Sequence, residues 1–169
     1  MRRVRVAPAG PRAHLRQMKH RDIQSPFGDL CLTETVGAVT ALEWGARGQD
    51  HSSPVLDQAE AELTAYFSGE QVEFNVPMRV DASEFQIAVC DAMRAIPFGE
   101  TCTYGDIAKA LGVPAQAVGQ ACGGNPIPIL IPCHRVMGAG GRLTGFSGQG
   151  GVETKVALLR HEGAGGFLL

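Results

Sequence analysis

Apolar positions recur at strand and helix spacings from residue 23 onward, and they define a first predicted unit over residues 21–80. Short apolar runs over residues 30–33 and 36–44 predict the two strands of a hairpin, and residues 72–76 alternate as a further strand. Between them, residues 57–67 carry apolar side chains on one side, which predicts an amphipathic helix. The pattern indicates a small α+β unit, and none of its residues stands out as catalytic.

A second predicted unit covers residues 81–169 and is mainly helical. Its expected helices span residues 84–94, 104–111, 114–121 and 152–162. Ser83 and Thr103 are suited to cap helix N-termini, and Gly112 is suited to end a helix. The two short helices joined at Gly112 resemble a helix-turn-helix, although periodicity alone favours tight packing for the small residues of the second helix.

The first 20 residues differ from both units. They contain six Lys and Arg, no acidic residue and no apolar periodicity, so we expect a disordered or loosely attached basic tail over residues 1–20. The whole chain has 169 residues and a net charge of −2, which predicts only modest nonspecific affinity for phosphate. No transmembrane segment and no secretory signal is expected.

Five cysteines form an odd set without a Cys-x-x-Cys pair. We therefore expect neither a disulfide framework nor a metal site, and we expect a reducing, cytoplasmic setting. For Cys31, Cys90 and Cys102, the expected role is that of a small buried hydrophobic residue.

Cys133 has a different sequence environment. Residues 129–131 are aliphatic and lead through Pro132 into Cys133, His134 and Arg135. We expect a buried strand that ends at the thiol. A thiolate is the strongest side-chain nucleophile, and a nearby imidazolium or guanidinium lowers the pKa of a thiol. By itself the segment is compatible with alkylation, acylation or metal binding, and His134 alone is equally compatible with a buried structural histidine.

Several separate motifs agree with one known family in order and spacing. They are Phe85-Gln86, Ile96-Pro97-Phe98-Gly99-Glu100-Thr101, Thr103-Tyr104-Gly105-Asp106-Ile107-Ala108, Gly124-Asn125-Pro126, residues 131–136, Gly145-Phe146-Ser147-Gly148 and residues 155–163. In these motifs the chain resembles the DNA repair alkyltransferases that remove alkyl groups from the O6 position of guanine. The resemblance covers residues 85–163 and is weak in the first unit.

The resemblance implies an α+β protein with a small ribonuclease-H-like N-terminal domain and a C-terminal winged helix-turn-helix domain. It implies that Cys133 attacks the alkyl carbon and keeps the group as a thioether, so that each molecule acts once. The implied substrates are O6-alkylguanine and O4-alkylthymine in double-stranded DNA. No cofactor, metal or membrane is implied, and we expect a monomer.

Roles for the site residues follow from the same resemblance. His134 is expected to act as the base through a water molecule, Glu162 to orient it, and Tyr104 to assist the departing guanine oxyanion. The expected substrate pocket comprises Val136, Phe146, Ser147 and Cys122.

The target base must be flipped out of the duplex, and the resemblance places the helix over residues 114–121 in the minor groove. Gln116 stands between Ala115 and Ala117, where many family members have an arginine that fills the resulting gap. We therefore expect weaker or slower repair.

Two further residues complete the expected DNA-binding set. Asn125 is expected to hold the turn before the active-site segment. Arg135 is expected to support the structure around the site or the neighbouring backbone.

Three alternatives compete with alkyl transfer. A non-catalytic protein that binds alkylated-DNA lesions would lack the cysteine. A regulator that uses the helix-turn-helix alone would leave the Pro-Cys-His-Arg segment unexplained. A Cys/His hydrolase has no matching protease signature in this sequence.

Overall fold

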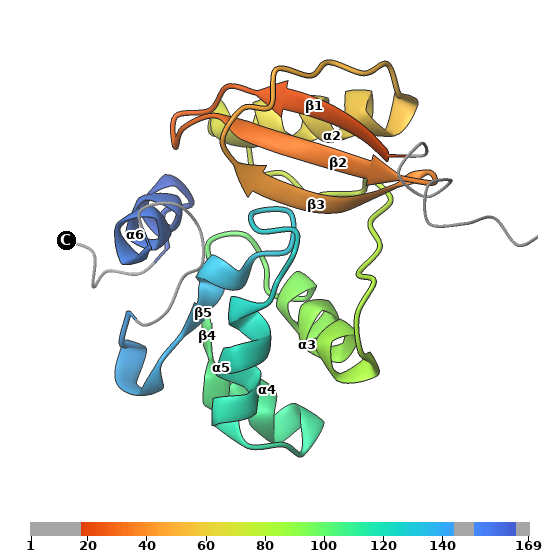
Figure 1. The fold of residues 1–169 in the computed structure, drawn as a ribbon. Helices are drawn as coiled ribbons and strands as arrows, with labels where there is room; N and C mark the ends of the chain where they lie inside the picture. The colour runs from red at the N-terminus through yellow and green to blue at the C-terminus, as the bar shows by residue number, and fades with distance from the viewer. Residues whose placement is uncertain (1–17, 144–150, 165–169) are drawn as a thin grey trace, which may run out of the picture.

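The computed structural model describes residues 18–143 and 151–164. In Figure 1, an upper part with a three-stranded sheet and a helix behind it lies above a lower part built mainly of helices. The strands are β1 (Met18–Ile23), β2 (Leu30–Thr35) and β3 (Ala38–Trp44), and they pair antiparallel in that order. The expected hairpin is present, with a tight turn in which Val36 and Gly37 both have positive φ.

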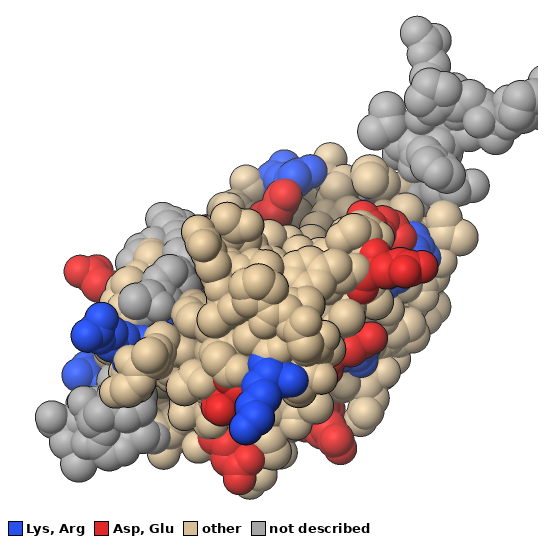
Figure 2. Space-filling model, turned by 90° about the horizontal axis from the view of Figure 1, so that it is seen from below, with Lys and Arg blue, Asp and Glu red and all other residues tan. Residues whose placement is uncertain are grey.

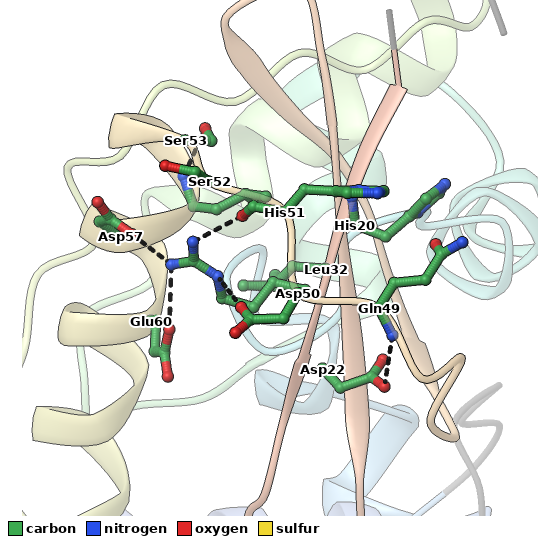
Figure 3. A network of polar contacts seen from close by, with 12 residues as sticks. His20, Asp22, Leu32, Gln49, Asp50, His51, Ser52, Ser53, Asp57 and Glu60 are labelled. Atoms are coloured by element: carbon green, nitrogen blue, oxygen red, sulfur yellow. Dashed lines mark hydrogen bonds and ion pairs between the residues drawn. The ribbon is translucent and has the colours of Figure 1, made fainter. Parts of the chain in front are cut away.

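Strand β1 begins at Met18, inside the segment that was expected to be a disordered tail through residue 20. That expectation is wrong for residues 18–20, which pair with β2. The strand is polar, but Arg21 points inward and is 7% exposed. Figure 3 shows the reason: its guanidinium contacts Asp50, Asp57 and Glu60, and it donates to the carbonyl oxygen of His51 at 2.7 Å. Three carboxylates neutralise the buried charge.

Helix α2 (Pro54–Phe67) covers one face of the sheet (Figure 1). It starts three residues before the predicted helix because Ser53 caps it, accepting from the backbone nitrogen of Leu56 at 3.2 Å, and Pro54 fits the first turn. The buried face of α2 consists of Leu56, Ala59, Leu63 and Tyr66.

Residues 72–76 do not form the predicted strand. The backbone nitrogens of Asn75 and Val76 donate to the carboxylate of Glu62, at 2.5 and 3.1 Å, so these groups have no partner strand. Further along the chain, Met78 makes an isolated bridge to Val39 of β3. The alternating pattern therefore reflects packing against α2 and not a ladder.

The lower part contains α3 (Glu84–Arg94), α4 (Tyr104–Leu111), α5 (Ala115–Gly123) and α6 (Val152–His161). Two-residue strands β4 (Cys102–Thr103) and β5 (Val136–Met137) pair parallel. A 3-10 helix covers Ala139–Gly141. The expected helix-turn-helix is present: Thr103 and Asp106 form a reciprocal cap at the start of α4, and Gly112 ends it in the left-handed conformation.

The two parts share one hydrophobic core. The same cluster contains Leu42 and Leu63 from the upper part and Ile127 and Ile129 from the lower part. A backbone hydrogen bond of 3.0 Å from Leu42 to Pro126 joins them directly. In the described ranges, no helix has the length and hydrophobicity needed to span a bilayer.

Candidate active site

The segment before Cys133 is a loop, and the predicted buried strand is wrong. Ile129 has a positive φ of 72°. The backbone nitrogens of Ile131 and Cys133 donate locally, to Ile127 and Ile131. Asn125 closes this loop from inside, because its amide nitrogen donates to the oxygen of Ile131 at 2.8 Å. Backbone groups that a neighbouring strand would satisfy are thus satisfied within the loop.

Cys133 opens a short 3-10 helix, Cys133–Arg135, and its side chain is buried. Burial raises the pKa of the Cys133 thiol to about 11, while Asn125 and the charge of Lys155 oppose this rise only in part. The expectation that the adjacent His134 and Arg135 would lower this pKa is wrong, because burial dominates. In the resting protein the thiol is neutral.

His134 is fully buried, and its Nε2 lies 2.6 Å from Oε2 of Glu162. Burial lowers the pKa of His134, although the carboxylate of Glu162 opposes this. Burial also disfavours the ionised form of Glu162, but hydrogen bonds from His134, Arg135 and Tyr66 outweigh it and lower its pKa to about 2. An ionised carboxylate only accepts, so Nε2 carries the proton and Nδ1 keeps a lone pair. Nδ1 has no hydrogen-bond partner among the described residues.

Arg135 contacts the same carboxylate and is 5% exposed. Its Nε donates to Oε1 of Glu162 at 2.7 Å, Nη2 to Oε2 at 3.1 Å, and Nη1 to the oxygen of Ile96 at 2.7 Å. The guanidinium therefore supports Glu162 from within, as one of its two expected roles required. Both Arg135 and Asn125 are buried, so in this structure they support the site from inside, and their assignment to the DNA-binding set stays a prediction.

Two buried residues near the site have no role in the sequence-based scheme. Tyr66 of α2 donates to Oε2 of Glu162 at 2.6 Å. Lys155 of α6 is 0% exposed, and its Nζ donates to the carbonyl oxygen of Val136 at 2.5 Å and lies 5.7 Å from the ring centre of Tyr104. A lysine inside an otherwise apolar helix face was the available signal for Lys155, whereas Tyr66 looked like an ordinary core aromatic.

A surface hollow of about 550 Å³ lies between the helices of the helix-turn-helix and the chain that follows β5. Tyr104, Ala115 and Gln116 line it, together with Gly119 and Gln120. Ala115 and Gln116 are exposed, whereas Ala117 is half-buried and does not line the hollow. Thus Tyr104 and Gln116, which were assigned different roles, face the same hollow.

The chain matches models of known protein families over most of its length. Residues 18–80 match the family described as 6-O-methylguanine DNA methyltransferase, ribonuclease-like domain, and residues 84–164 match the corresponding DNA binding domain. A methylated-DNA–protein-cysteine methyltransferase of Mycolicibacterium paratuberculosis is 41% identical, with 86% of this chain and 92% of the relative covered. The constitutive enzyme of that name from Bacillus subtilis is 37% identical, with 82% and 92% covered.

Solved structures agree. The crystal structure of Mycobacterium tuberculosis OGT in complex with DNA has a TM-score of 0.76 at 42% identity, with 89% of this chain and 97% of that chain covered. The M. tuberculosis O6-methylguanine methyltransferase also has a TM-score of 0.76, at 40% identity, with 86% and 93% covered. This chain belongs to the 6-O-methylguanine DNA methyltransferase family.

Membership of this family confirms the predicted fold class, an α+β protein with a ribonuclease-like N-terminal domain and a C-terminal DNA-binding domain. Within the pocket expected for the family, Val136 and Cys122 are buried. Burial, followed by the charge of Cys133, raises the pKa of Cys122 to about 12. Phe146 and Ser147 lie outside the described residues.

The surface around the helix-turn-helix is weakly charged for a family that binds DNA. Helix α4 carries Asp106 and Lys109, and α5 carries no charged residue. Figure 2 shows this end of the molecule from below, with Lys and Arg standing beside Asp and Glu and not forming a continuous basic stripe. In the described part of the chain, no group of three His, Cys, Asp or Glu side chains could hold a metal ion.

Proposed function

We propose that the protein repairs duplex DNA by transferring an alkyl group from O6 of guanine to Cys133, once per molecule. The observation that carries this proposal is the buried series Cys133, His134 and Glu162, in which the imidazole and carboxylate are 2.6 Å apart. Membership of the methyltransferase family supports the same reaction. O4-alkylthymine presents the same chemistry, an alkyl carbon on an exocyclic base oxygen, and is a second proposed substrate.

The transfer begins with proton movement. His134 accepts the thiol proton at Nδ1, by way of one water molecule, and the Glu162 carboxylate stabilises the imidazolium that forms. Because the pKa of the thiol is about 11, little thiolate exists at neutral pH without this transfer. The base therefore supplies the nucleophile at the moment of reaction.

The thiolate then displaces guanine from the alkyl carbon. The new bond joins Sγ to carbon, the bond between carbon and O6 breaks, and its electron pair stays on guanine. Tyr104, at the start of α4, donates a proton to this oxyanion, and the proton held by His134 then returns through water to the tyrosinate, so that both side chains end neutral. No step converts the product thioether back to a thiolate, so the protein is consumed.

The damaged base reaches the thiol after flipping out of the stack. We propose that α5 enters the minor groove and that Gln116 lies next to the gap left by the flipped base, because Gln116 and Tyr104 line one hollow. The domain over residues 81–169 supplies the reacting groups, and the protein acts as a monomer in a reducing cytoplasm, where its free thiols persist.

The test uses the intact protein and a duplex with one O6-methylguanine. Electrospray mass spectrometry should show one methyl in place of one hydrogen, and peptide mapping should locate it on Cys133. The Cys133→Ala variant should bind the duplex and gain no mass. If the wild-type mass stays unchanged while lesion binding persists, the protein is a lesion-binding relative and the transfer proposal fails.

A further inference from the structure

The hydroxyl of Tyr66 reaches the Glu162 carboxylate across the boundary between the two domains. Tyr66 lies near the end of α2 in the ribonuclease-like domain, and Glu162 follows α6 in the DNA-binding domain, 96 positions later. The Tyr66 hydroxyl is 2.6 Å from Oε2, the same oxygen that contacts His134 Nε2. Both residues are buried, so this contact is shielded from solvent.

We propose that Tyr66 is a positioning residue that sets the basicity of His134 through Glu162, so that the ribonuclease-like domain tunes the nucleophile of the other domain. The inference rests on the proposed role of His134 as the base. It assigns a function to a hydroxyl that packing alone does not require, since phenylalanine would fill the same space.

The direction of the effect follows from the shared oxygen. Oε2 receives hydrogen bonds from Tyr66, His134 and Nη2 of Arg135. Each donor draws negative charge from the carboxylate and leaves less to stabilise an imidazolium. Without the Tyr66 hydroxyl, Oε2 attracts the Nε2 proton more strongly, so the protonated form of His134 becomes more stable.

Other charged and titratable groups around the pair stay in place when this hydroxyl is removed. Arg135 donates to Oε1 of Glu162. The positive charges of Arg135 and of Lys155 from α6 both disfavour the imidazolium form of His134. Cys133 precedes His134 in the same 3-10 helix. Burial and the charge of Glu162 raise the pKa of Tyr66 above its ordinary value. The Tyr66 hydroxyl therefore keeps its proton and its hydrogen bond to Glu162 throughout the titration of His134.

The ring and backbone of Tyr66 are fixed independently of its hydroxyl. The ring packs against Phe67, Phe74 and Phe98, with centroid distances of 5.5, 5.6 and 6.1 Å. Its carbonyl oxygen lies 2.6 Å from Nε2 of His161, the residue before Glu162. Tyr66→Phe therefore removes one hydrogen bond and leaves both anchors of the contact.

The experiment measures the protonation of His134 directly. In full-length protein labelled with ¹³C-histidine, NMR titration without DNA gives the midpoint for His134, whose signal is assigned by its loss in His134→Gln. We expect Tyr66→Phe to move this midpoint upward by about one pH unit, the size expected for one hydrogen bond to a charged group. The acid limb of the single-turnover transfer rate should move by the same amount.

Leu63→Val is the matched control, since Leu63 is buried one turn earlier in α2. It should lower the melting temperature and leave the His134 midpoint where it is. An unmoved or lowered midpoint in Tyr66→Phe, or an equal shift in Leu63→Val, overturns the inference. A wild-type protein that transfers no methyl would instead refute the proposed function, and the NMR midpoint would still decide the coupling of Tyr66 to His134.

Discussion

Asn125 and Ile131 are joined by a hydrogen bond of 2.8 Å from the side-chain amide to the backbone oxygen, across a loop of six positions. The other end of the same amide accepts from the backbone nitrogen of Ile127 at 3.0 Å. One buried side chain thus holds both arms of the loop that delivers Cys133. A turn built this way depends on an amide, which has both a donor and an acceptor.

Asn125→Ala should therefore lower the free energy of unfolding by about 1–3 kcal/mol, because the buried nitrogen of Ile127 loses its acceptor and the oxygen of Ile131 keeps only its bond from Cys133. The transfer rate should fall as well, because Cys133 loses its fixed position. Urea denaturation and single-turnover methyl transfer measure the two effects. Asn75→Ala is the control: Asn75 is exposed, so its change should stay within about 0.5 kcal/mol. Equal stability of the two variants would contradict this account of the loop.

Glu162→Gln tests the buried carboxylate by the pH dependence of stability. In the folded protein the pKa of Glu162 is about 2, below its ordinary value of 4.5. A carboxyl with a lowered pKa stabilises the fold above the pKa of the unfolded state, and this contribution is lost as pH falls from about 4.5 towards 2. The wild type should thus be more stable than Glu162→Gln at pH 7, by about 3 kcal/mol.

The difference between the two proteins should narrow steadily below pH 5, because the wild type alone loses the Glu162 contribution. Guanidinium denaturation at several pH values between 7 and 3 measures it. Glu73→Gln, at an exposed position, should show no such narrowing difference from the wild type. A gap that stays constant with pH would mean that folding does not lower the pKa of Glu162.

The helices were predictable because local residues determine their ends. Ser83 caps α3, Thr103 caps α4, and Gly112 ends α4, and each of these signals acts within a few positions. The chemistry of the Cys133 segment was also visible, since Cys133, His134 and Arg135 are adjacent and Glu162 belongs to a motif of the resembling family.

Features that depend on distant partners were not predictable. Residues 72–76 alternate like a strand, but Glu62 from α2 takes their backbone nitrogens. Residues 18–20 look like a polar tail in the sequence. Only the acidic residues that surround Arg21 in the structure show how this polar strand can bury an arginine and pair with β2. Tyr66 joins the site through one contact across the domain boundary, which no local pattern records.

Cys133 should react slowly with ordinary thiol reagents. Burial raises its pKa to about 11, so at pH 7 iodoacetamide should label it far more slowly than a thiol in an unfolded peptide. The rate should rise about tenfold per pH unit as the thiolate fraction grows. Peptide mapping by mass spectrometry measures this, with urea-unfolded protein as the reference. Rapid labelling at pH 7 would show that the resting thiol is already ionised.

Gln116→Arg should strengthen DNA binding. Gln116 is exposed on a helix without charged residues, and it faces the same hollow as Tyr104. An arginine here adds one positive charge next to the phosphates and a planar group that can stack on the orphaned partner base. The slope of log affinity against log salt concentration should steepen by about one, and the single-turnover rate at low DNA concentration should rise severalfold.

Gln116→Lys separates the two contributions of that arginine. Lysine brings the same charge without the planar fork, so its salt slope should steepen equally while its transfer rate gains less. Fluorescence anisotropy over a range of salt concentrations and quenched single-turnover assays give both quantities. If arginine and lysine raise the rate equally, charge alone limits this protein and the gap left by the flipped base needs no filling. If neither changes affinity, Gln116 does not meet DNA, and α5 is not the element that enters the groove.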